Sequence, residues 1–206
     1  EANWVAALTV AFCGLLRAAE FALGPGRGFD PVDCLTRADV SFKWSGGRRH
    51  AVLMMRPCKN DKVEQGKTVP LLLPGGGRFL DPVAALDELF ARDPVPQSKW
   101  ARTPLFRDAS GAAITTRATR GVVKGLMAAV GEDARLFGAH SLRIGGATAA
   151  LAKGVPEVVI RAMGRWSSDI YQIYCRASDE AVLRFGVAIA SADFQDLESE
   201  YHNQEF

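Results

Sequence analysis

The chain has 206 residues, of which 48% are hydrophobic and 23% are charged, and its formal net charge is +2. Such values are ordinary for a globular protein and predict one substantial core. No apolar run reaches the roughly 18 residues of a membrane-spanning helix, so no membrane partner is expected. The four cysteines show no C-x-x-C spacing, which argues against a zinc site or a disulfide framework and favours a reducing, intracellular setting. Because the chain begins with Glu rather than Met, we expect it to be part of a longer protein.

The small net charge hides an uneven distribution. Residues 179–206 hold seven acidic residues and one basic residue, which leaves 24 basic and 16 acidic residues, a net charge of +8, in 1–178. A basic body with an acidic end suits a protein whose body binds a polyanion.

Positions 3–23 predict a largely buried helix, because apolar residues recur there at helical intervals. Arg17 and Glu20 interrupt that pattern, and their spacing of three places both on one face of a helix. An arginine among apolar residues is costly unless it is paired or used. Periodicity alone does not choose between a plain intrahelical salt bridge and a functional pair.

Three short segments, separated by Ser45-Gly46-Gly47 and by a polar stretch, predict a three-stranded antiparallel sheet. The expected strands are 38–44, 50–56 and 67–73. The remaining elements are expected to be helical, so the predicted fold class is mainly α with a small antiparallel sheet.

Two helices are predicted in the middle of the chain. One covers 81–91, with Asp81 as its cap, and the other begins at Thr115 or Thr116 and ends at Val130. The second helix carries basic residues at helical spacing, namely Arg117, Arg120 and Lys124. Their face is either solvated or lies along a DNA backbone, and the sequence leaves both interpretations open.

The stretch His140-Ser141-Leu142-Arg143-Ile144-Gly145-Gly146-Ala147 carries the strongest chemical signal. On a helix, His140 and Arg143 would project from one face. His140 can take up or release a proton near neutral pH, and Arg143 is a permanent cation whose planar donors match the geometry of a phosphate. If Ser141 caps this helix, its first N–H groups would face an anion as well. The glycines would let another backbone pack closely on the side away from that pair. A second helix is expected to start near Pro156.

Downstream lies Gly164-Arg165-Trp166-Ser167-Ser168-Asp169-Ile170-Tyr171-Gln172-Ile173-Tyr174, in which a phenol can serve as a nucleophile. Together the two stretches resemble the catalytic box of the tyrosine recombinase (phage integrase) family, in which His-x-x-Arg is followed by a Gly-His/Trp element and then by the tyrosine that attacks DNA. The wording HSLRIGGATAALAKGVPEVVIRAMGRWSSDIYQIYCRA is most similar to the branch carried by crypton and DIRS-type eukaryotic mobile elements. The similarity is specific over about 137–178 and looser back to residue 4.

The resemblance implies the tyrosine recombinase catalytic-domain fold and a DNA strand transferase that uses neither a metal nor a nucleotide cofactor. It implies that Tyr174 attacks the scissile phosphate to give a 3′-phosphotyrosine, that Arg17 and Arg143 clamp the phosphate oxygens, and that Glu20 buttresses the site. His140 would assist proton removal. Trp166 would donate its indole N–H toward the phosphate.

The general acid is assigned to Lys59, since Arg56-Pro57-Cys58-Lys59-Asn60-Asp61 resembles the family's lysine-bearing hairpin. Lys62 and Lys67 are plausible substitutes.

The spacing of the second box departs from the family pattern. Trp166 precedes Tyr174 by eight residues rather than the usual nine, and Arg165 stands at nine, so Arg165 is the alternative to Trp166. Tyr171 is a competing phenol, but the Tyr-x-Arg context around Tyr174 matches the family better.

We expect residues 1–178 to form the catalytic domain and residues 179–206 to form a C-terminal helix with an acidic tail. The apolar segment 180–190 packs either on its own domain or on a neighbouring protomer, in which case the protein assembles as a dimer or tetramer on double-stranded DNA. The expected location is intracellular, and nuclear if the source is eukaryotic. The alternatives are a domesticated DNA-binding module without catalysis and a type IB topoisomerase-like enzyme that relaxes DNA. The family's separate N-terminal DNA-clamping domain is not found in the sequence, so we expect target choice to depend on a further domain.

Overall fold

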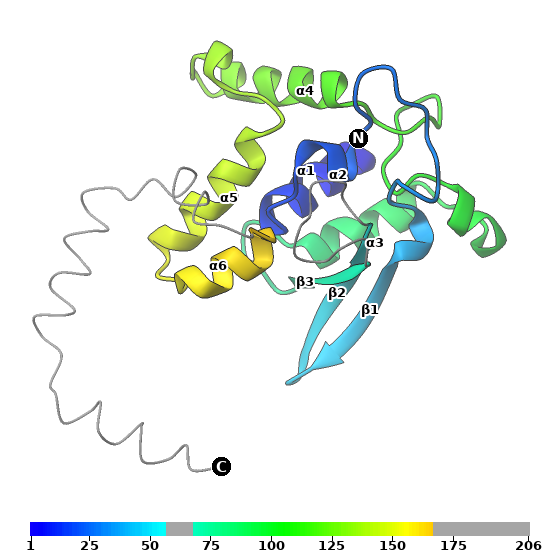
Figure 1. Ribbon diagram of the computed structural model, residues 1–206, viewed down its shortest axis with the longest axis horizontal. Helices are drawn as coiled ribbons and strands as arrows, with labels where there is room; N and C mark the ends of the chain where they lie inside the picture. Colours follow the sequence, from blue (N-terminus) through cyan, green and yellow to red (C-terminus); the bar gives the residue numbers. More distant parts are fainter. Residues whose placement is uncertain (57–67, 167–206) are drawn as a thin grey trace, which may run out of the picture.

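The structure is a computed structural model in which residues 1–56 and 68–166 are described. In this part of the chain the helices are α1 (Ala2–Cys13), α2 (Ala18–Phe21), α3 (Pro82–Arg92), α4 (Thr116–Ala129), α5 (Ser141–Ala152) and α6 (Glu157–Gly164) (Figure 1). Three 3₁₀ turns are η1 (Arg37–Asp39), η2 (Gln97–Arg102) and η3 (Ala134–Leu136). The strands are β1 (Val40–Ser45), β2 (Arg48–Met55) and β3 (Val69–Pro74).

The strands form one antiparallel sheet in the order β1-β2-β3, which confirms the predicted sheet and the mainly α fold class. In the register, Val40 pairs with Leu53, and Leu53 pairs with Leu71. The β1–β2 turn uses Gly46 and Gly47, both with positive φ, as a two-residue hairpin turn requires.

The helices cover one face of the sheet. Helix α3 packs against β2 and β3, and α1 packs against α3 on one side and α5 on another. In Figure 1, α4 and the sheet lie on opposite sides of α1. The core between these layers is built from alternate residues of the strands and from the small residues of α1, including Ala6, Ala7 and Ala11.

The predicted single helix over 3–23 is wrong, because it is broken in the middle. Helix α1 ends at Cys13, Leu15 adopts a left-handed conformation with φ 51°, and α2 begins only after Arg17. Gly14 packs so closely on the sheet that an added Cβ would stand 2.8 Å from a methyl of Leu71. The turn therefore brings residues 14–17 into the centre of the molecule, where a continuous helix would have carried them past it.

The helix caps read from the sequence are confirmed for α3 and α4. The side chain of Asp81 accepts hydrogen bonds from the N–H groups of Val83 and Ala84, and the hydroxyl of Thr115 accepts one from the N–H of Ala118. Among the described residues, no helix has both the length and the apolar character needed to cross a bilayer.

Candidate active site

Arg17 and Glu20 form the first half of the site, at the N-terminal end of α2. The backbone N–H of Arg17 donates to Glu20 Oε2 at 2.6 Å, and its Nη1 donates to Oε1 at 2.9 Å. Arg17 is the N-cap of α2 with an extended backbone rather than a residue inside a helix. Glu20 therefore fixes both the backbone and the guanidinium of Arg17.

Glu20 also binds a second arginine from a distant part of the chain. Nη2 of Arg165, at the C-terminal end of α6, lies 2.7 Å from Glu20 Oε2. Both side chains are nearly buried, with exposures of 8% for Arg165 and 9% for Glu20, whereas Arg17 is 34% exposed. One carboxylate thus holds two guanidinium groups, of which only that of Arg17 is open to solvent to a substantial extent.

Arg143, on the first turn of α5, joins α1, α5 and α6 at one point. Its guanidinium donates to the carbonyl oxygen of Leu15 and, at 2.7 Å, to that of Gly164, and Arg143 is only 2% exposed. The neighbouring carbonyl of Arg165 accepts from Arg17 Nη2 at 3.2 Å. Two consecutive carbonyls at the end of α6 therefore orient two different arginines.

Trp166 completes this cluster by placing its ring against the guanidinium of Arg143. The guanidinium carbon of Arg143 lies 4.0 Å from the centroid of the indole ring, and Trp166 is nearly buried. A cation so close to a ring face is attracted by the ring, which helps to hold the Arg143 guanidinium in place. An added Cβ on Gly164 would come within 1.9 Å of the Trp166 ring, so only glycine fits at position 164.

Arg165 and Trp166, the two candidates for the family's Gly-His/Trp element, both belong to the cluster, but they contact different residues of it. Arg165 contributes a charged side chain bound to Glu20, and Trp166 contributes the face of its ring to Arg143. Arg165 itself lies in the left-handed region with φ 55°, which turns the chain at the end of α6 and separates the two side chains.

The close approach predicted for the glycines of α5 is confirmed, but its direction is not the expected one. An added Cβ on Gly146 would lie 2.3 Å from the carbonyl oxygen of Phe12. The backbone of α1 therefore occupies the space that a side chain at position 146 of α5 would need. Arg143 reaches Leu15 on that same side. The glycines therefore do not pack away from Arg143; they bring α1 close enough for Arg143 to bind it.

His140 occupies the N-cap position of α5, and its side chain is exposed, whereas Arg143 is buried. Partial burial of the imidazole, together with the positive charge of Arg143, lowers the pKa of His140 below its usual value. The neutral form, which can accept a proton, is thereby favoured near neutral pH. The predicted cap by Ser141 is wrong, since its hydroxyl instead accepts from the N–H of Gly138 at 3.0 Å.

The basic residues predicted on the DNA-facing side lie on α4. Arg117 and Arg120 are exposed and Lys124 is half-buried. The Arg120 side chain runs past Gly138, with its Cγ 3.8 Å from the position of an added Cβ there. Arg120 therefore stands beside the segment that leads into His140.

Other predicted site residues lie outside the described residues. These are Lys59, its substitutes Lys62 and Lys67, the nucleophile Tyr174, its competitor Tyr171, and the whole C-terminal segment 179–206.

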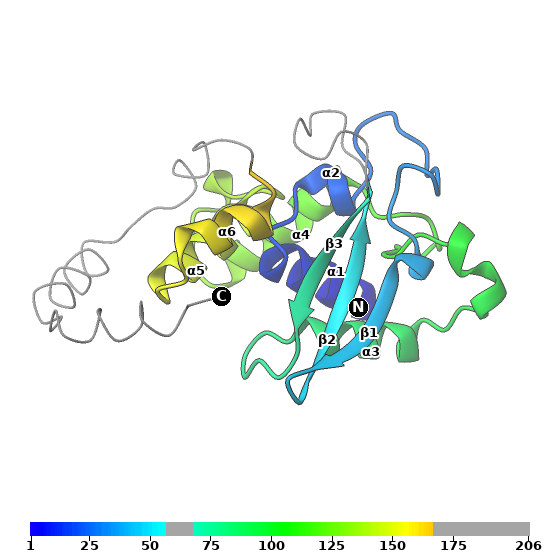
Figure 2. The same cartoon turned by 60° about the horizontal axis from the view of Figure 1, so that its bottom comes forward.

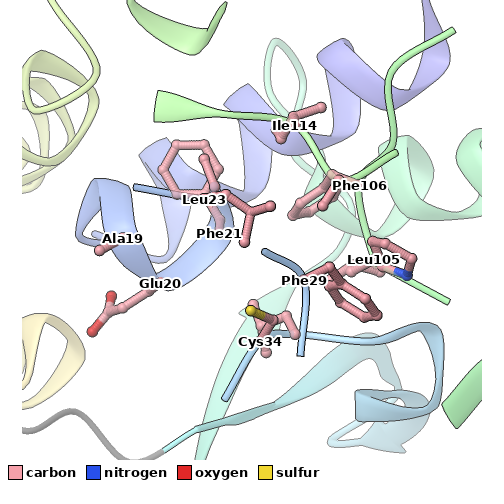
Figure 3. Close-up of a pocket in the computed structure, with 13 residues that line it drawn as sticks. Ala19, Glu20, Phe21, Leu23, Phe29, Cys34, Leu105, Phe106 and Ile114 are labelled. Atoms are coloured by element: carbon pink, nitrogen blue, oxygen red, sulfur yellow. The ribbon is translucent and has the colours of Figure 1, made fainter. Parts of the chain in front are cut away.

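A small cavity of about 20 Å³ lies on the other side of α2 from the arginine cluster. Figure 3 shows apolar side chains such as Phe21, Phe29 and Ile114 turned toward one another around it, while the Glu20 carboxylate points away. That volume holds roughly one water molecule. The cavity is thus part of the packing behind α2 rather than a ligand site. Within 1–56 and 68–166, no three His, Cys, Asp or Glu residues gather as they would around a metal ion.

The electrostatic character of the cluster follows from its partners. Among its described members, Arg17, Arg143 and Arg165 carry three positive charges, and Glu20 carries one negative charge. The carbonyls of Leu15, Gly164 and Arg165 orient the guanidinium groups without cancelling their charge. This arrangement preserves positive charge at a fixed position, which is what recognition of a phosphate needs.

Comparison with solved structures places this arrangement in a known fold. XerA recombinase aligns with a TM-score of 0.60 and 18% identity, over 93% of this chain and 63% of its own. XerH site-specific recombinase, bound to a palindromic difH substrate in a post-cleavage complex, aligns with a TM-score of 0.57 and 18% identity, over 89% of this chain and 44% of its own. The chain has the fold of a tyrosine recombinase catalytic domain. It spans less than two thirds of the length of either recombinase.

At these identities the likeness establishes the tyrosine recombinase fold alone. An activity has to be argued from the residues of the site. Comparison with protein-family models and with curated proteins gave no match. The pre-cleavage complex of XerH with difH substrate aligns equally well, with a TM-score of 0.57 and 19% identity over 93% of this chain and 47% of its own.

The sequence reasoning missed the backbone groups of the site. The carbonyls of Leu15, Gly164 and Arg165 carry no side-chain signal, although they hold two of the arginines. The only available hint was Gly164, directly before the Arg165-Trp166 pair, because a glycine at a helix end often marks a close approach.

Proposed function

We propose that this chain cleaves and rejoins double-stranded DNA, as a site-specific recombinase or integrase, through a phosphotyrosine intermediate. The observation that carries the proposal is the cluster in which Arg17 and Arg143 donate to carbonyls at the end of α6, while Arg165 binds Glu20. The recombinase fold adds support, since XerH with that fold is described in complexes with its substrate before and after cleavage.

In the proposed reaction, the hydroxyl oxygen of Tyr174 attacks the scissile phosphorus and the bond to the 5′ oxygen breaks. This gives a 3′-phosphotyrosine and a free 5′-hydroxyl. His140 takes the phenol proton, as its lowered pKa suits, and Lys59 gives a proton to the leaving oxygen. A 5′-hydroxyl from another strand then attacks the phosphotyrosine and releases Tyr174, so no net energy input is required.

The arginines stabilise the charge that builds on the non-bridging oxygens in the pentacoordinate state. Arg17 is the exposed member and makes the first contact. Arg143 is buried in this DNA-free structure, so its contact requires that DNA binding opens access to its guanidinium. Removal of one such fixed donor is expected to slow the reaction on the order of a hundredfold.

The DNA backbone is proposed to run along α4, where Arg117, Arg120 and Lys124 contact phosphates. The support is the position of Arg120 beside Gly138, two residues from His140, which makes the α4 face continuous with the site. We further propose assembly as a dimer or tetramer on DNA through 180–190, a relation to the crypton and DIRS-type branch, and a nuclear location in a eukaryotic cell. The support for this part of the proposal is the wording of residues 137–178 and the basic character of residues 1–178.

The test is capture of a covalent protein–DNA adduct. A pool of nicked duplexes with randomised sequence traps any phosphotyrosine, because the short fragment that carries the free 5′-hydroxyl diffuses away. The trapped sequences also report the target site. Wild type is expected to form adducts, Tyr174→Phe none, and the matched control Tyr171→Phe as many as wild type. Adducts formed by Tyr174→Phe would refute the assigned nucleophile.

Two other outcomes would replace the proposal. Tight duplex binding without any adduct indicates a DNA-binding module without catalysis. Relaxation of supercoiled plasmid by dilute, monomeric protein, without strand exchange, indicates a topoisomerase-like enzyme.

A further inference from the structure

A second charged surface lies at the opposite end of the sheet from α2. There the β1–β2 turn and the loop from β3 to α3 lie at the same end of the sheet (Figure 2). They border an open groove of about 510 Å³. The two segments are joined by a 3.0 Å hydrogen bond from the N–H of Gly75 to the carbonyl of Arg49. We call this surface the hairpin groove; its lining residues are Gly47, Arg48, Arg49, Gly75, Gly76, Asp81, Val83, Ala84 and Asp87.

The carboxylates of the hairpin groove are already occupied. Asp81 accepts from the backbone N–H groups of Gly76, Val83 and Ala84, and Asp87 is bound by both terminal nitrogens of Arg49. Neither acid is therefore available to bind a cationic ligand.

The cations around the groove are, by contrast, not neutralised. Arg48 lines it, Lys43 lies three residues before Gly46, and Arg78 lies two residues after Gly76; all three lack an ion pair within the described part of the chain. Counting these with Arg49, Asp81 and Asp87 gives four positive and two negative charges. The groove is therefore a net cationic surface.

Two aromatic rings stand exposed beside these charges. Trp44, which pairs with the groove residue Arg49, is 72% exposed, and Phe79 is 88% exposed. The guanidinium carbon of Arg78 lies 5.3 Å from the centroid of the Phe79 ring. Rings so exposed contribute little to folding, whereas alternating cations and open ring faces fit phosphates and unpaired bases.

The backbone of the groove is open to close contact as well. An added Cβ on Gly47 or Gly76 would meet no atom within 4 Å, and both residues have positive φ. No side chain stands at Gly47 or Gly76, so a nucleotide chain can approach the peptide groups of these two residues directly.

We propose that the hairpin groove binds single-stranded DNA, with bases stacked on Trp44 and Phe79 and with phosphates on Arg48 and Arg78. A paired duplex does not offer its base faces to such rings, so unpaired strands are preferred. This binding is separate from cleavage at the arginine cluster and does not depend on it.

The test is fluorescence anisotropy of the full chain with a labelled oligothymidylate of about 15 nucleotides. The double variant Trp44→Ala/Phe79→Ala is expected to bind at least about tenfold more weakly, since each stacked base contributes substantially to affinity. Val32→Ala, at an apolar residue that is 72% exposed elsewhere, is the matched control and is expected to bind as wild type does.

A second pair of variants tests the charges. Arg48→Glu/Arg78→Glu is expected to weaken binding and to reduce the slope of log affinity against log salt by roughly 1.4, from about 0.7 for each lost phosphate contact. Lys99→Glu/Arg102→Glu, at two exposed cations on η2, is the charge-matched control.

Saturating unlabelled duplex separates this proposal from the proposed recombinase activity. Oligothymidylate is expected to stay bound in the presence of duplex, and to bind Arg120→Glu and Tyr174→Phe normally, whether or not adducts form. The proposal is overturned if the double variants bind like their controls, or if duplex displaces the oligonucleotide and Arg120→Glu abolishes its binding.

Discussion

Replacing Gly146 by alanine tests how closely α1 and α5 must approach for Arg143 to reach Leu15. The new Cβ would stand 2.3 Å from the carbonyl oxygen of Phe12 and 2.6 Å from Leu15 Cδ2. The leucine methyl can rotate, but the carbonyl belongs to the backbone of α1 and cannot. The two helices would have to separate by roughly 1 Å to restore an ordinary contact, because packed interiors leave no free space.

The magnitude follows from two opposing effects. Alanine in a helix interior is favoured over glycine by about 1 kcal/mol, whereas overpacking typically costs about 1–3 kcal/mol. Separation also weakens the hydrogen bond from Arg143 to the Leu15 carbonyl, and hydrogen bonds to charged groups contribute about 1.5–3 kcal/mol. The sum is an expected net loss of about 2 kcal/mol or more.

Two glycines of the same chain provide controls. Gly121, on α4, has no atom within 4 Å of an added Cβ, so Gly121→Ala should gain about 0.5–1 kcal/mol. At Gly145 the nearest atom is Cε2 of the Phe12 ring at 3.1 Å, which can swing aside, so Gly145→Ala should stay close to wild type. Urea unfolding followed by circular dichroism should rank the midpoints with Gly121→Ala highest and Gly146→Ala lowest. A Gly146→Ala midpoint at or above wild type would show that α1 and α5 are not in this contact.

Three further predictions concern single residues. Glu20→Gln keeps the shape of the side chain but removes the negative charge that two guanidinium groups share, so urea unfolding should show that the free energy of unfolding falls by about 2 kcal/mol. The control Glu88→Gln, in an exposed pair with Arg92, should change the free energy of unfolding by less than about 0.5 kcal/mol. Because the pKa of His140 is lowered, the neutral imidazole persists into more acidic solution; adduct formation should rise with pH around a midpoint below 6.5, and His140→Asn should lose that dependence. Asp81→Ala removes the acceptor for three backbone N–H groups and should lower thermal stability by about 1–2 kcal/mol, measured by calorimetry.

The sequence predicted the elements whose signals are local. Gly46-Gly47 requires a tight hairpin turn, and Asp81 and Thr115 carry the oxygens that cap α3 and α4. In each case a residue and its partner are close in the chain, so composition and spacing suffice to identify the structure.

The sequence could not predict the break at Leu15, because its cause is distant. A leucine with φ 51° is uncommon, and periodicity favours an unbroken helix. Its carbonyl accepts from Arg143, which lies 128 residues further along the chain, and the turn exposes that carbonyl. The expectation that Ser141 could cap α5 failed for a local reason. Its hydroxyl could accept from more than one nearby N–H group, and in the structure it accepts from the N–H of Gly138.

The arrangement of the arginines explains why the chain departs from helical periodicity at this point. Three guanidinium groups in a nearly dry region repel one another, and a carboxylate for each would remove both the repulsion and the positive charge. Among the described residues, Glu20 binds two of the arginines, and backbone carbonyls accept hydrogen bonds from Arg17 and Arg143. Within a helix, carbonyls are left over for such partners only at the C-terminal end, because the interior uses its own. The turn at Leu15, directly after α1, and the end of α6 at Gly164 are therefore the features that allow Arg143 to be buried, oriented and still charged.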